Sequence, residues 1–252
     1  MEPSRRDFLV LAAGGLAASC APSFAGERAK PRYRAVAFDG FPVFDPRPVF
    51  ALAEEIFPGQ GAALGAAWRS RQFEYQWLRA LAGRYADFAK ATEDALVAAA
   101  RALRLDLAPD ARARLTAAFG RLKAWPDAAP ALRTLRDAGV RLAFLSNMTP
   151  GMLEAGIANA GLDGLFDHVL STDAVRTYKP DPRAYRLGLD AFGLEREEIL
   201  FAAFAGWDAA GAKWFGYPTF WVNRLGSPRE ELGAAPERAG RDLTDLVRFV
   251  LP

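Results

Sequence analysis

The second half of the chain constrains the fold most, because helical and strand-like segments alternate there without interruption. After Trp125-Pro126 a helix ends near Gly139, an apolar strand follows, and the pattern repeats as far as Val222. Strands are expected at residues 140–146, 168–171, 199–203 and 218–222, with helices beginning near Thr149, Asp181 and Asp208. Such alternation predicts a parallel sheet with helices on both of its faces.

One more strand is expected at residues 33–38, a short apolar run that ends at Asp39. Between this strand and Trp125 the patterns are helical throughout, over residues 63–85, 92–105 and 110–122. We therefore expect an α/β fold with a Rossmann-like core and a helical cap inserted after the first strand. The expected core is 26–45 and 124–252, and the expected cap is 46–123.

Polar side chains follow four of the expected strands. They are Asp39, the pair Ser146 and Asn147, Lys179, and Asp208. Because parallel strands end at one edge of a sheet, these side chains should gather in a single site. Simpler interpretations remain open, since Asp208 could cap its own helix and Ser146-Asn147 could be a turn.

Composition excludes several kinds of chemistry. The formal net charge of +2 and the lack of a dense basic run make nucleic acid a poor partner. The chain has one cysteine, Cys20, and one histidine, His168, so it can form no internal disulfide and offers no Cys/His zinc site. We expect carboxylates, hydroxyls, Lys and Arg to do the chemistry, without a metal or cofactor.

The N-terminus is typical of an export signal. Residues 4–9 contain the pair Arg5-Arg6 and resemble a twin-arginine signal, and the apolar run at 8–18 is too short to span a bilayer. Cleavage after Ala25 would leave a periplasmic protein with no membrane insertion. The alternative is a lipoprotein signal that would place a lipid anchor on Cys20.

The order of the strand-end residues resembles the haloacid dehalogenase superfamily, and in particular its type II (S)-2-haloacid dehalogenases. The resemblance covers nearly all of the mature chain. It is carried by Trp68-Arg69, Gln72-Phe73-Glu74-Tyr75, Trp77-Leu78-Arg79, Arg84-Tyr85, Phe88, Ala91-Thr92-Glu93-Asp94-Ala95-Leu96, Tyr178-Lys179-Pro180-Asp181, Trp207-Asp208-Ala209 and Gly211-Ala212.

Within that superfamily, two phenylalanines favour dehalogenation over phosphate hydrolysis. Phosphatases of this kind carry a second Asp two residues after the nucleophile, and paired acids near the fourth strand that hold magnesium. Here Phe41 and Phe204 occupy those positions. A phosphoryl group needs a metal to offset its charge, whereas a halide leaves as a stable anion.

The resemblance implies a covalent mechanism. Asp39 would displace halide from a short 2-haloacid and form an ester, and Asp208 would activate the water that hydrolyses it. Lys179 would keep both carboxylates ionised. Arg69, from the cap, would bind the departing halide, although an exposed Arg on this helix could equally be a surface ion-pair residue.

The remaining substrate contacts follow from the same resemblance. Backbone N–H groups at Ser146 and Asn147 would bind the substrate carboxylate. Tyr185 matches a pocket tyrosine of the family, and Phe41, Phe88 and Trp207 would form apolar walls. A simpler interpretation is that Tyr185, Phe88 and Trp207 only pack.

Three polar supports common in the family are missing here. Val43 stands where a threonine is usual, and Ala203-Phe204-Ala205 replaces a Ser-Ser-Asn run. The pocket should therefore be drier and its charges less firmly oriented. Two other functions stay open: hydrolysis of a different small substrate, or a catalytically weak periplasmic carboxylate-binding protein. The expected partners are the small haloacid and a second copy of the chain in a homodimer.

Overall fold

The computed structural model describes residues 30–252. Its strands are β1 Ala35–Phe38, β2 Phe44–Asp45, β3 Lys123–Ala124, β4 Arg141–Ser146, β5 His168–Ser171, β6 Ile199–Ala203, β7 Thr219–Val222 and β8 Arg238–Gly240. Its α-helices are α1 Gly40–Val43, α2 Arg47–Ile56, α3 Gly61–Leu81, α4 Phe88–Ala102, α5 Pro109–Ala118, α6 Ala128–Asp137, α7 Pro150–Asn159, α8 Pro182–Phe192, α9 Gly206–Phe215 and α10 Leu243–Val250. Short 3-10 turns lie at Phe119–Arg121, Thr172–Val175 and Arg196–Glu198.

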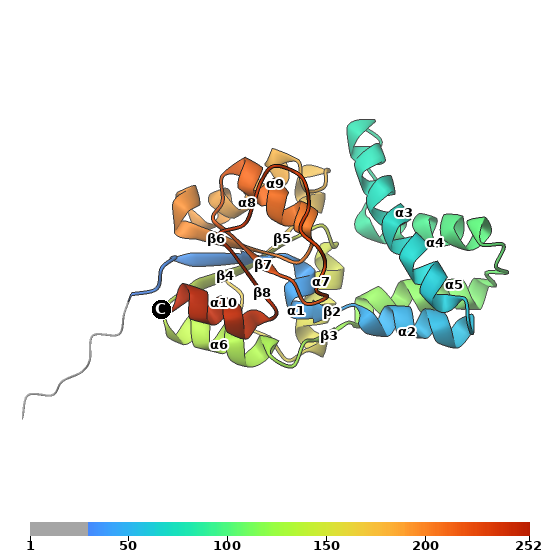
Figure 1. Ribbon diagram of the computed structural model, residues 1–252, viewed down its shortest axis with the longest axis horizontal. Helices are drawn as coiled ribbons and strands as arrows, with labels where there is room; N and C mark the ends of the chain where they lie inside the picture. Colours follow the sequence, from blue (N-terminus) through green and yellow to red (C-terminus); the bar gives the residue numbers. More distant parts are fainter. Residues whose placement is uncertain (1–29) are drawn as a thin grey trace, which may run out of the picture.

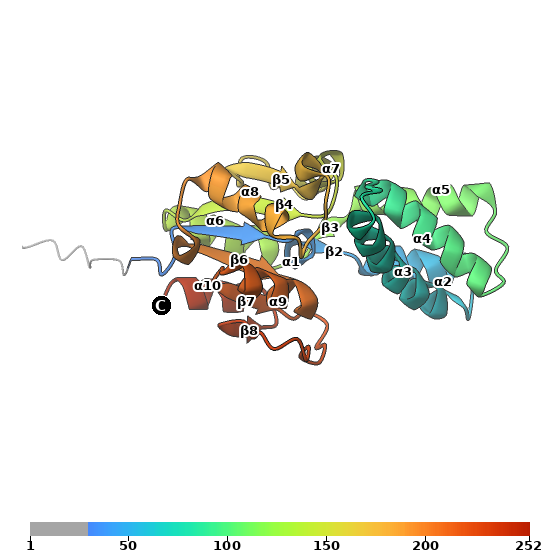
Figure 2. The same ribbon diagram turned by 90° about the horizontal axis from the view of Figure 1, so that it is seen from above.

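A six-stranded sheet forms the centre of the core, in the order β5-β4-β1-β6-β7-β8. Every neighbouring pair in this sheet is parallel. Seen from above in Figure 2, β1 lies inside the sheet, and the helical cap stands beyond the carboxyl ends of the strands. Asp39, which directly follows β1, therefore lies near the middle of the sheet edge that faces the cap.

Alternate side chains of the strands pack on opposite faces of the sheet, as the pleat of a strand requires. On one face, Val36 and Phe38 of β1 join a core that includes Leu132 of α6 and Leu246 of α10. On the other face, Ala35 and Ala37 pack with residues of α8 and α9, among them Tyr185 and Phe215. The two helical layers lie below and above the sheet in Figure 1. The expectation of an α/β fold with helices on both faces is confirmed.

The cap consists of α2, α3, α4 and α5. The chain enters it through β2 and leaves it through β3, and these two strands pair antiparallel, with Phe44 opposite Ala124. The long helix α3 packs along α4, and its Trp68 indole donates a hydrogen bond to the backbone oxygen of Thr92 (2.8 Å). Buried cap residues such as Leu64 and Trp68 belong to the same apolar cluster as the core.

Several expected boundaries were wrong. The helix expected at 92–105 begins at Phe88, because the Asp87 side chain caps it by accepting from Lys90 N. The helix expected at 63–85 ends at Leu81, and Gly83 then takes a positive φ of 66° that turns the chain. Helix α10 was not predicted, although its capping residue Asp242 was a readable start signal.

Within residues 30–252, no helix combines the length and the apolar character needed to cross a bilayer. The expected signal segment 1–25, together with the alternative lipid site at Cys20, lies outside the described residues.

Candidate active site

Asp39 is buried directly after the central strand β1. Its backbone N–H donates to Ala202 O at 3.0 Å, which fixes the main chain against β6. Its side chain turns back over α1, where Oδ2 accepts a hydrogen bond from Phe41 N (3.2 Å). Asp39 thus caps α1, but its other oxygen, Oδ1, accepts hydrogen bonds from Ser146 at the end of β4 and from Lys179 in the loop before α8. The capping role and a chemical role coexist in this residue.

Lys179 connects the two carboxylates of the site. Its ammonium Nζ lies 2.9 Å from Asp39 Oδ1 and 2.6 Å from Asp208 Oδ2. All three side chains are buried, and that of Lys179 is only 1% exposed. A buried charge is tolerated only when it is paired and hydrogen-bonded, so this triad is a built arrangement. The three residues that sequence analysis assigned to catalysis lie together.

Asp208 belongs to the first turn of α9 and does not cap it. The N-cap residue of α9 is Ala205, which makes no side-chain capping bond. The Asp208 carboxylate instead contacts Lys179 through Oδ2, and its Oδ1 accepts a hydrogen bond from the Tyr185 hydroxyl (2.7 Å). The alternative in which Asp208 only caps its helix is therefore excluded for this structure.

Burial and neighbouring charges shift the pKa values of Lys179 and Asp208. Burial raises the pKa of Asp208 to about 6, and the nearby charge of Asp39 adds to the rise, while Lys179 and the Tyr185 hydroxyl oppose it. Burial alone would lower the pKa of Lys179, but the carboxylates of Asp208 and Asp39 raise it above its ordinary value. At neutral pH Lys179 is therefore a cation, and Asp208, which is ionised above about pH 6, can accept a proton.

Ser146 lies at the end of β4, beside β1. Its hydroxyl donates to Asp39 Oδ1 at 3.2 Å and accepts a hydrogen bond from Met148 N (3.3 Å). Gly40 permits this approach, because a Cβ at that position would lie 2.8 Å from the Met148 sulfur and 3.1 Å from Ser146 Oγ. The Ser146 side chain therefore faces the Asp39 carboxylate.

Asn147 holds the backbone of Lys179. Its Oδ1 accepts from Lys179 N at 3.0 Å, and its Nδ2 donates to Gln76 Oε1 of α3 at 3.0 Å. A weaker contact joins the same Oδ1 to the Thr172 hydroxyl (3.4 Å). Both ends of the Asn147 amide thus bind protein groups. It holds the main chain of Lys179, a role that sequence analysis had not given it.

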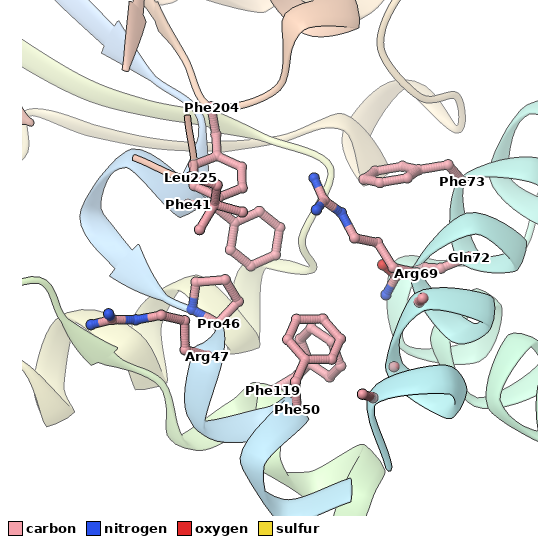
Figure 3. A pocket seen from close by; sticks show the side chains of 13 residues that line it. Phe41, Pro46, Arg47, Phe50, Arg69, Gln72, Phe73, Phe119, Phe204 and Leu225 are labelled. Carbon is pink, nitrogen blue, oxygen red and sulfur yellow. The ribbon is translucent and has the colours of Figure 1, made fainter. Parts of the chain in front are cut away.

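A cavity of about 270 Å³ opens between the cap and the core. Figure 3 shows Phe41 and Phe204 on its core side and Arg69 and Phe73 reaching in from α3. The Phe41 and Phe204 rings pack with centroids 5.6 Å apart. Asp39 itself is not part of the wall. The other lining residues are Pro46, Arg47, Phe50, Ala62, Gly65, Ala66, Gln72, Phe119 and Leu225.

Arg69 brings a positive charge to this apolar cavity. Its guanidinium makes no ion pair with any residue in the range 30–252, and burial lowers its pKa from the ordinary value. Figure 3 shows it extending between Phe73 and the Phe204 side of the cavity. The interpretation of Arg69 as a surface ion-pair residue does not fit this placement. A half-buried cation without a protein partner suits an anion.

Of the ten predicted site residues, two line this cavity, Arg69 and Phe41, and Tyr185, Phe88 and Trp207 are among those that do not. Tyr185 is fully buried beneath α9, where Gly211 leaves room for its hydroxyl beside Asp208. Phe88 is buried in the cap and contacts Phe119 edge to face, so it supports the wall from behind. Trp207 packs edge-on against both Phe73 and Trp77 and lines an adjoining hollow that shares Arg69 and Phe204.

Sequence reasoning missed the neighbours of Arg69 on α3. Positions 69, 72, 73 and 76 recur at intervals of three and four, which places them on one face of a helix. Gln72 and Phe73 line the cavity, and Gln76 reaches Asn147. That periodicity was present in the sequence and could have identified them. The contributions of Phe50 and Phe119 were not readable, because they depend on how α2 and the end of α5 pack.

The arrangement supplies a nucleophile, a base and a cation between them, which is a set suited to covalent hydrolysis. Among residues 30–252, no cluster of three or more His, Cys, Asp or Glu side chains could hold a metal ion. The apolar rings of Phe41 and Phe204, which pack against each other, offer no oxygen ligand to a hard cation.

Comparison with known proteins gives concordant matches. A model of haloacid dehalogenase-like hydrolases matches residues 28–216. An (S)-2-haloacid dehalogenase of Pseudomonas sp. (strain YL) is 45% identical over 205 residues, covering 81% of this chain and 88% of that protein. A crystal structure of an L-2-haloacid dehalogenase superposes with a TM-score of 0.85 at 48% identity, covering 87% and 99% of the two chains. The L-2-haloacid dehalogenase of Xanthobacter autotrophicus with chloropropionic acid covalently bound gives 0.79 at 37% identity, over 86% and 98%.

Proposed function

This chain belongs to the haloacid dehalogenase-like hydrolases, within the group of (S)-2-haloacid dehalogenases, and we propose on that premise that it hydrolyses short 2-haloacids to 2-hydroxyacids through an ester on Asp39. The observation that carries the proposal is the buried contact of Lys179 Nζ with both Asp39 (2.9 Å) and Asp208 (2.6 Å). Binding alone would not require two carboxylates held in a buried site at that cost.

In the first step, an oxygen of Asp39 attacks C2 of the haloacid, and the carbon–halogen bond breaks with its electron pair leaving on the halide. Oδ2 is the better placed oxygen, because it accepts only one hydrogen bond, from Phe41 N, whereas Oδ1 accepts two. Attack opposite the halogen inverts C2. Arg69 offers its unpaired charge to the halide as it leaves.

In the second step, water attacks the carbonyl carbon of the Asp39 ester and gives up a proton to Asp208. Oδ1 is then the carbonyl oxygen, and it carries the negative charge of the tetrahedral intermediate. Lys179 Nζ and Ser146 Oγ already donate to this atom. Preorganised donors of this kind are the largest single source of catalysis in many acyl-transfer sites. The intermediate collapses as the bond between the Asp39 carboxyl carbon and Oδ2 breaks. Oδ2 leaves on C2 as the hydroxyl oxygen of the 2-hydroxyacid and takes back the proton held by Asp208, with C2 still inverted. The oxygen of the water stays on Asp39, and the second proton of that water goes to solvent.

The site replaces polar supports with aromatic ones. Phe41 and Phe204 pack against each other beside the nucleophile, and Ala203 and Ala205 carry no hydrogen-bonding side chain. Tyr185 and Ser146 supply donors to the two carboxylates instead. A drier site strengthens each of these interactions. The proposal therefore needs neither a metal nor the missing threonine at position 43.

The test is the fate of isotopic oxygen and of the ester. Purified protein with (S)-2-chloropropionate should release chloride and form (R)-lactate. In a single turnover in H₂¹⁸O, the label should enter Asp39 and not the lactate. Asp208→Asn should slow the second step more than the first, so intact mass spectrometry should detect substrate minus halide on Asp39. Asp39→Asn should give neither halide nor adduct.

Other outcomes would redirect the assignment. Adduct formation on Asp39 with a different electrophile, but not with haloacids, would favour a hydrolase of this scaffold with another small substrate. Tight binding of haloacids by Asp208→Asn without any adduct would favour the carboxylate-binding protein, because the cavity and Arg69 would then bind the haloacid without any reaction at Asp39.

We also propose export to the periplasm, on the strength of Arg5-Arg6 and the short apolar run that follows. Cells that express the wild type should hold it in the periplasmic fraction, and Arg5→Lys/Arg6→Lys should keep it in the cytoplasm. Equal cytoplasmic location of both would refute this. A membrane fraction that disappears in Cys20→Ala would favour the lipoprotein alternative.

We further propose that the protein forms a homodimer through apolar residues exposed where α3 meets α9. Leu81 is 86% exposed and Trp214 57% exposed, and both line one hollow with Leu232. Exposed apolar clusters of this kind mark interaction sites. Light scattering should give twice the mass of the chain, and Leu81→Glu should halve it. A monomeric wild type would refute the proposal.

A further inference from the structure

The peptide unit of Lys179 is held from the cap. Its carbonyl oxygen accepts a hydrogen bond from the indole Nε1 of Trp77 (3.1 Å), which belongs to α3. Its N–H donates to Asn147 Oδ1, and the same Asn147 amide donates to Gln76 of α3. Two consecutive cap residues therefore reach both ends of one catalytic residue, Trp77 directly and Gln76 through Asn147.

These contacts are specific. Lys179 is 1% exposed, so its carbonyl has no access to solvent as a replacement partner. Gln76 is fully buried, and among the described residues its amide nitrogen has no acceptor. Among the described residues, the hydrogen bond that Gln76 Oε1 accepts from Asn147 is thus the one that the Gln76 side chain makes. Tyr178, the preceding residue, adds a third link by donating its hydroxyl to Ala86 O of the cap.

We infer that Trp77 and Gln76 are positioning residues, through which the cap helix α3 sets the place of the Lys179 ammonium between Asp39 and Asp208. This inference rests on the proposed function. The Lys179 side chain begins at the clamped peptide unit, so a shift of that unit moves Nζ relative to both carboxylates. Misplacement of a catalytic group by about 1 Å can cost roughly a hundredfold in rate.

The inference is tested with two variants that remove one link each. Trp77→Phe keeps a ring to pack on Phe73 and Trp207 but loses the N–H. Gln76→Leu keeps the volume but loses the acceptor for Asn147. Each should lower kcat by roughly 10- to 100-fold with little change in KM. Halide release by the wild type is measured alongside, and its absence would refute the proposed function itself. If the wild type is active, the two variants test only whether Trp77 and Gln76 position Lys179.

A pH profile separates positioning from general damage. The groups that face the Asp208 carboxylate are Lys179, Asp39 and Tyr185, and Lys179 lowers its pKa. A looser lysine should therefore move the acid limb of kcat to higher pH in both variants. The matched control is Trp68→Phe, which loses an indole hydrogen bond inside the cap, to Thr92 O. The inference is overturned if Trp77→Phe and Gln76→Leu keep the kcat and the acid limb of the wild type. It is also overturned if the acid limb of Trp68→Phe shifts as far as theirs.

Discussion

Removal of the Lys179 charge should destabilise the fold as well as stop catalysis. In Lys179→Met, the buried carboxylates of Asp39 and Asp208 would lose the cation that both contact, at 2.9 and 2.6 Å. Removing one partner from a buried ion pair costs about 3–5 kcal/mol, a large part of the roughly 5–15 kcal/mol that stabilises a domain. The melting temperature should therefore fall by about 6–20 °C.

The loss should depend on pH. Burial raises the pKa of Asp208 to about 6 and Lys179 opposes that rise, so the variant's Asp208 pKa should lie higher still. A carboxyl whose pKa is higher in the folded state than in the unfolded state favours folding when it is protonated. The stability deficit of Lys179→Met should therefore shrink as pH falls below that raised value, and it should be larger at about pH 8 than at about pH 5.

Urea unfolding at both pH values measures the effect. Lys213→Met is a matched control, because Lys213 pairs with Glu237 near the surface, where such a pair contributes at most about 1 kcal/mol. The double variant Lys179→Met/Asp208→Asn should recover part of the loss, since one buried charge is then gone. A deficit below about 1 kcal/mol at pH 8, or one that grows as pH falls, would refute the reasoning that the triad is a charged buried network.

Four further outcomes are expected. The kcat of the wild type should rise with pH through about 6, because Asp208 accepts a proton only when ionised, and a flat profile across that range would exclude it as the base. Tyr185→Phe should move the acid limb to higher pH, because the Tyr185 hydrogen bond lowers the pKa of Asp208 in the wild type and its removal lets that pKa rise. An acid limb at the wild-type pH would contradict the contact. Arg69→Met should lower kcat about 10- to 100-fold, because the leaving halide then loses a charged contact in the transition state, while Arg71→Met, from an exposed pair, should not; equal effects would refute an anion site. Halide release should be the same with EDTA and with added magnesium, and a magnesium requirement would favour a phosphatase.

The local pattern of the sequence was enough to bring together Asp39, Lys179 and Asp208. Asp39, Lys179 and Asp208 each follow an apolar strand, and parallel strands must end at one edge of their sheet. Their convergence therefore needs only strand identity and direction, although Asp39 and Lys179 are 140 positions apart. Helix boundaries near Asp87 and Leu81 were less readable, because capping and turn residues decide them one position at a time.

Tertiary packing alone decided what the neighbouring side chains do. Nothing in the Ser146-Asn147 dipeptide indicates that one side chain turns to Asp39 and the other to the Lys179 backbone. Trp77 lies 102 positions from its acceptor on Lys179, and that pairing exists only because α3 docks over the carboxyl edge of the sheet. The periodicity of a strand or helix fixes the face on which a residue lies. The partner it meets depends on how separate elements pack, and for that reason only the assembled structure revealed the contacts between the cap and the main chain of Lys179.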